Sequence, residues 1–378
     1  MIYLDAAATT LHKPPEVYRA MAQASRRMSS PGRGSYPASH LAEETAYRCR
    51  SEAAELFGVP SPEQVVFTFN ATHGLNIAIK TLVHPGSRVV VSGYEHNAVT
   101  RPLYAIPGVE ILVADAPLFQ PEKAVEGFTE ALTKGVDVAI CNHVSNVFGT
   151  VQPIEEIAAL CRRHHVPLIV DASQSAGVLP IELEAWGAAF VAMPGHKGLY
   201  GPQGTGLLLC HHPAVPLLEG GTGSASLRQE MPDFLPDQLE AGTHNMPGIA
   251  GLLEGIRFVR RTGCEAIAKQ ERMTAARAVQ RLREVPGVRV FADDGFHAQT
   301  GVVSFTIEGR DCEEIGEALA QKGIAVRAGL QCAPLAHRTA GTLHTGTVRL
   351  STSAFTTLAQ VDHFAEVLRG IVRENGAL

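Results

Sequence analysis

Short runs of apolar, mostly β-branched residues alternate with helical patterns through the middle of the chain. Strands that alternate with helices predict an α/β fold with a mostly parallel sheet flanked by helices on both faces. In such sheets a ligand binds at the carboxyl ends of the strands. The predicted strands are Gln64–Phe69, Arg88–Ser92, Val136–Cys141, Pro167–Val170, Ala188–Met193 and Gly206–Cys210, and the predicted helices are Leu41–Phe57, Thr72–Leu82 and Ile154–His164.

The pattern changes near Gly263. A long helix, short strands and further helices follow, which predicts a smaller α+β domain that the first residues of the chain join. We therefore predict a large domain over residues 15–260 and a small domain made of residues 1–14 and 261–378. The elements predicted for the small domain are the helices Cys264–Glu284 and Val361–Glu374 and the strands Val288–Phe291, Val302–Ile307 and Ile324–Arg327.

The composition narrows the class of protein. Of the 378 residues, 45% are hydrophobic, which is ample for a large buried core. The formal net charge is −6 and no block of Lys or Arg stands out, so we expect no nucleic-acid partner. The apolar runs fall short of the ~18 residues that a membrane helix needs, and the first residues lack the regions of a signal peptide. We therefore expect no membrane partner.

Cysteine and histidine usage points to a reducing compartment without a metal site. The seven cysteines are an odd number, lie far apart and form no CxxC motif. This spacing argues against a disulfide framework and is typical of the cytoplasm. The 16 histidines are scattered without the regular spacing of metal ligands. We therefore expect a cytoplasmic protein that binds no metal.

Two polar residues follow successive predicted strands. Lys197 lies in the glycine-rich segment Met193–Gly206, directly after a strand. A lysine nucleophile needs partial burial, and glycines let a cofactor approach the backbone. Asp171 ends the preceding apolar strand, where a carboxylate needs a cationic partner such as a protonated pyridine nitrogen. Taken singly, Lys197 fits an exposed turn and Asp171 a helix N-cap, but the pair favours a cofactor site.

With these residues the chain resembles the class V aminotransferase-fold enzymes that use pyridoxal 5′-phosphate (PLP). Within them it is similar to the cysteine desulfurases, particularly their second group, which includes the selenocysteine lyases. The resemblance extends from Tyr3-Leu4-Asp5-Ala6-Ala7-Ala8-Thr9-Thr10 to Val348-Arg349-Leu350-Ser351, essentially the whole chain. It implies the fold type I of PLP-dependent transferases, PLP as the cofactor and a homodimer as the assembly.

The resemblance also implies roles around the cofactor ring. Lys197 holds PLP as a Schiff base and afterwards moves protons, Asp171 pairs with the pyridine nitrogen, and Gln174 hydrogen-bonds the phenolic oxygen. His96 stacks on the ring and is a candidate for proton transfer, and Asn146 lies near the substrate carboxylate and the ring oxygen. Taken singly, a His or Asn at a strand end often only satisfies loop backbone groups.

The phosphate of the cofactor needs N–H groups and hydroxyls. The turn from a predicted strand into a helix places the N–H groups of Thr72 and His73 at a positive helix end, which suits an anion. By the resemblance, His196 adds a donor, and Thr243 reaches the phosphate of the neighbouring subunit. One departure lies at Pro194, in the region where the family usually has a serine or threonine. Proline has neither a hydroxyl nor an N–H group, so phosphate binding depends more on the other donors.

Substrate chemistry is indicated by the last third of the chain. Arg349 matches the family arginine that holds the substrate α-carboxylate with a bidentate fork. Cys332 ends the segment Arg327-Ala328-Gly329-Leu330-Gln331-Cys332-Ala333, which fits the Arg-x-Gly-x-x-Cys-Ala arrangement of the second desulfurase group. The resemblance implies that Cys332 attacks the substrate sulfur and carries it as a persulfide. The cation of Arg327 favours the thiolate form, and Arg327 is also a predicted substrate-binding residue. A second departure is Leu330-Gln331, where this group commonly has histidines.

The sequence therefore predicts a PLP-dependent cysteine desulfurase that converts L-cysteine to L-alanine and passes the sulfur to a protein acceptor. On the same fold, a selenocysteine lyase acting on L-selenocysteine, a cysteine or cystine C–S lyase and an aminotransferase remain open. A non-catalytic PLP-fold protein would be expected to lack Lys197 or Asp171, and both residues are present.

Overall fold

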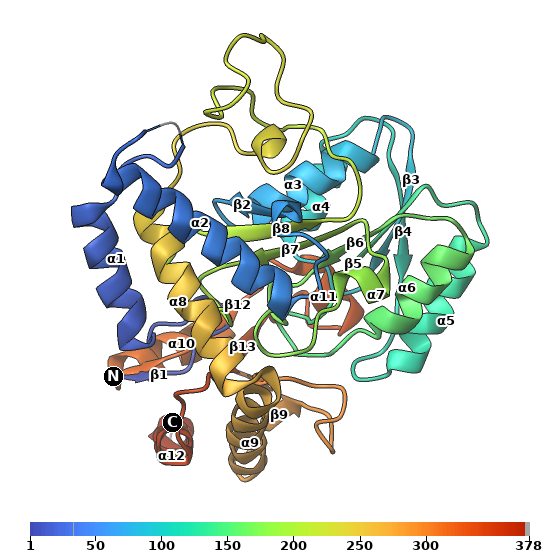
Figure 1. Cartoon of the computed structure of the whole chain (residues 1–378). Helices are drawn as coiled ribbons and strands as arrows, with labels where there is room; N and C mark the ends of the chain where they lie inside the picture. Colours follow the sequence, from blue (N-terminus) through green and yellow to red (C-terminus); the bar gives the residue numbers. More distant parts are fainter. Residues whose placement is uncertain (33, 375–378) are drawn as a thin grey trace.

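The computed structural model of the chain describes residues 1–32 and 34–374. Its largest feature is a seven-stranded sheet with the strand order β2-β8-β7-β6-β5-β3-β4 (Figure 1). The strands from β7 to β4 run parallel, while β8 runs antiparallel to both β7 and β2. The strands are β2 (Val65–Thr68), β3 (Arg88–Ser92), β4 (Glu110–Ala114), β5 (Val138–Asn142), β6 (Leu168–Asp171), β7 (Phe190–Pro194) and β8 (Gly206–Cys210).

Apolar side chains cover both faces of this sheet. Within β6, Leu168 and Val170 pack into one core cluster and Ile169 into the other, because successive residues of a strand point to opposite faces. Helices α2, α5, α6 and α8 cover the first face, and α3 and α4 cover the second. The helices around this sheet are α1 (Pro15–Arg27), α2 (Pro37–Leu56), α3 (Ala71–Leu82), α4 (Asn97–Tyr104), α5 (Pro121–Leu132), α6 (Ile154–Arg163), α7 (Leu183–Trp186) and α8 (Met246–Thr262), with the short 3₁₀ turns η1 (Pro62–Gln64) and η2 (Asp237–Leu239).

A second, antiparallel sheet has the strand order β12-β13-β10-β9, and a third core cluster lies between it and the helices α9, α10 and α12. A short parallel pair, β1 with β11, joins the start of the chain to this part of the molecule. The elements here are β1 (Ile2–Tyr3), α9 (Cys264–Arg283), β9 (Val288–Phe291), β10 (Val302–Ile307), α10 (Cys312–Gln321), β11 (Ile324–Ala325), β12 (Arg327–Gly329), α11 (Pro334–Thr339), β13 (Thr347–Ser351) and α12 (Leu358–Glu374).

The predicted fold class is confirmed, and most predicted elements lie where the sequence pattern places them. Two of the six strands predicted for the large sheet have the expected bounds, and the other four shift by one or two residues. The pattern does not predict β4, an edge strand with partly exposed residues. The single strand predicted over Ile324–Arg327 is wrong: the chain divides at Val326, because β11 pairs with β1 whereas β12 pairs with β13. The division into two domains stays a prediction.

The first ten residues connect the two larger sheets. Leu4 exchanges backbone hydrogen bonds with Ala325 and Ser351, next to β13. The Thr10 N–H then donates to the carbonyl of His196 at 3.0 Å, on the loop that carries Lys197. This segment therefore ties the loop at the end of β7 to the C-terminal part of the chain. None of the helices in the described residues combines the length and apolar character that crossing a membrane requires.

Candidate active site

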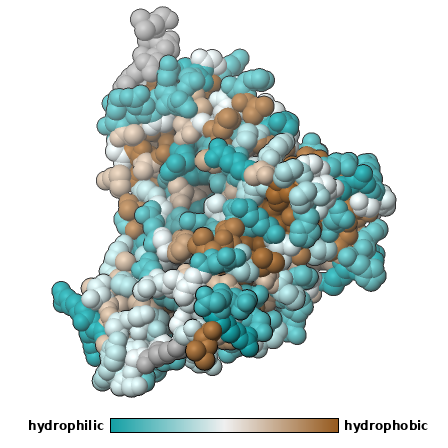
Figure 2. Space-filling model, turned by 90° about the horizontal axis from the view of Figure 1, so that it is seen from above, coloured by the Kyte–Doolittle hydropathy of each residue, from teal (hydrophilic) through white to brown (hydrophobic). Residues whose placement is uncertain are grey.

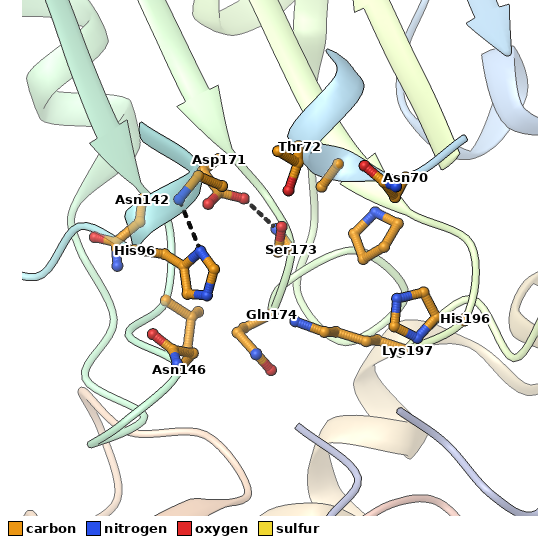
Figure 3. A pocket seen from close by; sticks show the side chains of 14 residues that line it. Asn70, Thr72, His96, Asn142, Asn146, Asp171, Ser173, Gln174, His196 and Lys197 are labelled. Carbon is orange, nitrogen blue, oxygen red and sulfur yellow. Dashed lines mark hydrogen bonds between the residues drawn. The ribbon is translucent and has the colours of Figure 1, made fainter. Parts of the chain in front are cut away.

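A cleft lies at the carboxyl ends of β5, β6 and β7, where the strand order of the parallel sheet predicts a ligand site (Figure 3). It contains about 510 Å³ of empty space, part of which is open to solvent. The residues that line it are Asn70, Ala71, Thr72, His96, Ala98, Asn142, Val144, Asn146, Asp171, Ser173, Gln174, Pro194, His196 and Lys197.

Lys197 extends into the cleft from the loop that follows β7, on the side opposite His96 (Figure 3). Glycines shape this loop because a side chain at Gly195 would collide with Thr205, and one at Gly198 would collide with the carbonyl of Ala176. Burial lowers the pKa of the Lys197 amine to about 8, and the charge of Asp171 opposes this shift. An amine with such a pKa is neutral often enough near pH 8 to act as a nucleophile.

Asp171, the last residue of β6, places a buried carboxylate in the cleft. Its Oδ1 accepts a hydrogen bond from the Ser173 N–H at 2.9 Å (Figure 3). Gln174 also lines the cleft, and its Nε2 donates to the carbonyl of Ala7 at 3.0 Å. The strand-end carboxylate and the amine of Lys197 thus lie in one cleft, as the sequence predicts.

His96 is the N-cap of α4. Its Nδ1 accepts a hydrogen bond from the Ala98 N–H at 3.0 Å, so the neutral ring carries its proton on Nε2. Burial lowers the pKa of His96, and the neighbouring Asp171 partly opposes this effect. The ring is therefore neutral at physiological pH, with Nε2 as the nitrogen available to a ligand.

The start of α3 and the loop after β7 form another end of the cleft. Thr72 lines the cleft, but His73 is not among the described lining residues: its ring stacks on Phe69, and its N–H donates to the Asn70 side chain. Asn70 is thus the N-cap of α3, and this local cap uses one of the two N–H groups predicted for an anion.

The loop after β7 adds His196, whose Nδ1 lies 3.1 Å from the Thr9 hydroxyl. Burial, together with the charges of Lys197 and Lys13, lowers its pKa to about 4, so the ring is neutral at pH 7. Pro194 also lines the cleft and brings no donor to it.

A carboxylate that sequence reasoning did not assign, Asp5, joins the two predicted substrate arginines. Its Oδ1 accepts from Arg349 Nη2 at 2.7 Å, and its Oδ2 accepts from Arg327 Nη2 at 2.9 Å. Arg349 is 2% exposed, whereas Arg327 is exposed on its outer side. A buried guanidinium requires a counter-charge, but the sequence gives no sign that this charge comes from a residue 344 positions away.

Arg349 also reaches Asn146, since its Nη1 donates to the Asn146 carbonyl at 2.7 Å. Among the described residues, neither Arg349 Nε nor Asn146 Oδ1 has a hydrogen-bond partner, although both atoms are buried. A buried polar atom without a partner is costly, so these two atoms mark a place where a polar ligand group would be stabilised.

Cys332 follows β12 and its side chain is exposed. Its carbonyl accepts from the N–H of Asn97, the residue after His96, at 2.8 Å. The preceding carbonyl, that of Gln331, accepts from Asn146 Nδ2 at 2.8 Å. The loop of Cys332 is therefore bonded directly to the cleft residue Asn146 and to Asn97, the neighbour of His96.

Thr243 lies elsewhere on the chain. It is exposed and lines a separate cavity beside a buried ion pair between Arg50 and Glu240. His244 donates to the same Glu240 carboxylate at 2.5 Å. The structure thus does not bring Thr243 to the cleft of its own chain, which accords with a role toward a neighbouring subunit and does not test it.

Glu95 is a second residue that sequence reasoning did not assign. It is fully buried behind the cleft, where its Oε1 accepts from the Ser92 hydroxyl at 2.6 Å and from the Asn142 N–H at 2.7 Å. Burial raises the pKa of Glu95 to about 8, and the nearby charge of Asp171 contributes to the shift. The acid is therefore mostly protonated at neutral pH, which avoids a second buried negative charge near Asp171. Within the described chain, no three metal-ligating side chains gather at one place.

Comparison with known proteins shows the family of the chain. The family model of the class V aminotransferases matches residues 2–364, and the chain belongs to this family. It is 32% identical to a probable cysteine desulfurase of Methanothermobacter thermautotrophicus, over 98% of this chain and 94% of that protein. It is 31% identical to a probable cysteine desulfurase of Mycolicibacterium paratuberculosis, over all of this chain and 56% of that protein. The chain spans about three fifths of the length of the first curated relatives it matches.

Solved structures give the same result. The apo cysteine desulfurase of Thermococcus onnurineus matches with a TM-score of 0.90 and 28% identity, over 99% of this chain and 95% of that one. The cysteine desulfurase CsdA of Escherichia coli matches with a TM-score of 0.86 and 25% identity, over 98% and 94% of the two chains. The chain is thus a homologue of the cysteine desulfurases within a family of PLP-dependent enzymes.

Proposed function

We propose that this protein is a PLP-dependent cysteine desulfurase, which converts L-cysteine to L-alanine and transfers the sulfur to Cys332 as a persulfide. The observation that carries the proposal is the combination of a buried amine and a buried carboxylate in one cleft with an exposed thiol on a loop bonded to that cleft. An aminotransferase has no use for this thiol, whereas a desulfurase requires it.

The residues of the cleft fit PLP. Lys197 would bind its aldehyde carbon, and Asp171 would pair with its ring nitrogen. His96 offers Nε2–H and a ring face, and Thr72 and His196 would contact the phosphate. The bound cofactor supplies an electron sink for the carbon next to the substrate amine.

The substrate carboxylate would be held by Arg349. One of its terminal nitrogens donates to the Asn146 carbonyl and the other to Asp5, which fixes the guanidinium plane. The buried Nε, unpartnered within the described residues, can then donate to a carboxylate together with the second proton of Nη2. Such binding would also give Nε a hydrogen-bond partner, which removes the free-energy cost of burying it unpaired.

The chain's own groups then account for proton and sulfur transfer. The Lys197 amine, once free, accepts the proton from the α-carbon, since its pKa of about 8 leaves much of it neutral near pH 8. The Cys332 thiolate attacks the substrate sulfur, so that an S–S bond forms while the C–S bond breaks. The electron pair of the C–S bond passes to the β-carbon, which takes up a proton. The Lys197 ammonium then returns its proton to the α-carbon, which completes alanine.

Replacement of Cys332 by alanine tests the proposal. We expect purified wild-type protein to form equal amounts of alanine and sulfide from L-cysteine with a reductant, and we expect Cys332→Ala to lose this activity by at least about 100-fold. Cys264→Ala is the control, because Cys264 is half-buried at the start of α9. Pyruvate and ammonia as products would instead indicate elimination, an oxo-acid requirement would indicate transamination, and cleavage of L-selenocysteine alone would indicate a selenocysteine lyase.

A homodimer is part of the proposal. Thr243 would then reach the phosphate held by the neighbouring subunit from its separate cavity. Exposed apolar side chains on the connection between β8 and α8, such as Val215, Leu227 and Phe234, support a covered surface. Figure 2, seen from above, shows apolar patches on the face that bears this connection. A mass measurement by light scattering tests this assembly. The proposal also includes a protein sulfur acceptor and a cytoplasmic location.

A further inference from the structure

The backbone at Cys332 is strained. Gln331 and Cys332 both have left-handed conformations, with φ of 42° and 56°. Residues other than glycine rarely adopt this region, and each such residue costs on the order of 1 kcal/mol or more. Two in succession persist only where the surrounding structure holds them. The groups that hold this loop are therefore part of how the thiol is placed.

The Gln331 side chain is bonded at both ends. Its Nε2 donates to the Thr347 carbonyl at 2.9 Å, and its Oε1 lies 2.9 Å from Nε2 of His337. The side chain is buried, so neither bond competes with water. The first bond ties the loop to β13, two residues before Arg349, and the second ties it to α11.

His337 continues the same chain of hydrogen bonds. It is fully buried, and burial lowers its pKa to about 4, so the ring is neutral at pH 7. Because Gln331 Oε1 can only accept, His337 must carry its proton on Nε2. Its Nδ1 is then an acceptor, and the Thr342 hydroxyl, 2.7 Å away, donates to it. Donors thus follow one direction, from Thr342 through His337 and Gln331 to the Thr347 carbonyl.

The other side of the loop meets the cleft. The Gln331 carbonyl accepts from Asn146 Nδ2, and the Cys332 carbonyl accepts from the N–H of Asn97. A shift of the loop at Gln331 would therefore move the Cys332 thiol relative to the cleft. Because these contacts are made by main-chain carbonyls, they remain when the Gln331 side chain is replaced.

We propose that Gln331, held by the hydrogen-bond chain Thr342–His337–Gln331–Thr347, is a positioning residue that fixes the Cys332 thiol for attack on the substrate sulfur. This role rests on the proposed desulfurase function and assigns a purpose to a residue at which the chain departs from its family. These hydrogen bonds affect the sulfur-transfer step and leave the chemistry at the substrate α-carbon unchanged.

Gln331→Met tests this role, since methionine has a similar length and makes neither bond. Leu330→Met is the matched control, because Leu330 is the exposed neighbour. With the PLP-loaded enzyme, we expect kcat for sulfur release from L-cysteine to fall about 10- to 100-fold in Gln331→Met, the loss typical of a misplaced reacting group. Exchange of the α-proton of L-alanine with deuterated water should stay within about two-fold of wild type.

A second measurement does not depend on turnover. In hydrogen–deuterium exchange of the whole protein, the segment from Arg327 to Thr339 should exchange at least about 10-fold faster in Gln331→Met, and at the wild-type rate in Leu330→Met. Thr342→Val removes only the hydrogen bond between the Thr342 hydroxyl and His337, so this variant should show smaller changes of the same kind. This variant decides the matter if Gln331→Met does not fold.

The outcomes separate the two proposals. Unchanged sulfur release and unchanged exchange of the segment in the variants would overturn the role of Gln331. An equal loss of α-proton exchange and sulfur release would also overturn it, because the defect would then lie at the cofactor. If wild-type protein releases no sulfur from L-cysteine, the proposed function fails, while the hydrogen exchange still tests whether Gln331 holds the loop.

Discussion

The loops of Lys197 and Cys332 supply the two reactive side chains of the site, yet they are held in different ways. Backbone contacts hold much of the Lys197 loop: the Gly195 N–H donates to the Thr205 carbonyl at 2.8 Å, and the Gly201 N–H to the Gly195 carbonyl at 2.7 Å. The Thr10 hydroxyl adds contacts to the carbonyls of His196 and Lys197, at 3.0 and 3.1 Å. Side chains from outside the loop, Asn146 and His337 of α11, hold the Cys332 loop.

The positions of the two reactive side chains therefore depend on the surrounding residues in different ways. Bonds between backbone groups of neighbouring residues survive most substitutions nearby, so the position of Lys197 should tolerate changes elsewhere. The thiol is placed by individual side chains on several elements, and each of them is a point at which its position can be lost. The N-terminal segment links the two regions, since Thr10 bonds to the Lys197 loop and Asp5 to Arg349.

The largest effect is expected at Lys197. We expect Lys197→Ala to reduce alanine formation from L-cysteine by at least about 10⁴-fold, because the nucleophile and proton acceptor are both lost. Lys80→Ala, at an exposed position late in α3, is the control and should keep wild-type activity. Residual activity above a few per cent of wild type would remove Lys197 from the mechanism.

The link between the two regions is tested at Asp5. Asp5→Ala leaves the buried Arg349 without its counter-charge, and we expect the free energy of unfolding to fall by about 3–5 kcal/mol. Chemical denaturation of the apoprotein measures this change. Glu16→Ala breaks an exposed ion pair with Arg19 and should cost at most about 1 kcal/mol. Equal losses in the two variants would contradict the assigned role of Asp5.

The pH dependence of stability tests Glu95, which is buried behind the cleft. The folded protein holds the Glu95 pKa near 8, above its unfolded value of 4.5. Below pH 4.5 Glu95 is protonated in both states and does not change the free energy of unfolding. As the pH rises toward 8, Glu95 ionises mainly in the unfolded state, which lowers the free energy of unfolding. We therefore expect Glu95→Gln to gain about 3 kcal/mol relative to wild type between pH 5 and pH 8.

Urea unfolding of the apoprotein at several pH values measures this gain. The exposed Glu130→Gln serves as a control and should show no such trend. A difference between Glu95→Gln and wild type that does not vary with pH would show that Glu95 is ionised in the folded protein.

Much of the site could be predicted because it lies at strand ends. A run of apolar residues ending in Asp171, and a glycine-rich loop around Lys197, are local signals, and parallel strands bring such ends together. His73 shows the limit of this reasoning: its N–H was expected at an anion site, but a local cap by Asn70 uses it. The competition between a ligand and a cap is decided by a side-chain rotamer, which the sequence does not specify.

The α/β class, most elements of the large sheet and a set of candidate reactive residues could be predicted from the sequence alone, because these predictions depend on periodicity and on short motifs. The tertiary structure decided that Asp5 pairs with Arg349 and Arg327, that Glu95 lies protonated behind Asp171, and that Gln331 bonds to His337. Except for the short-range contact of Gln331 with His337, these contacts depend on the packing of segments far apart in the chain. Burial then removes water as the alternative partner, so each polar group must find its counterpart within the protein.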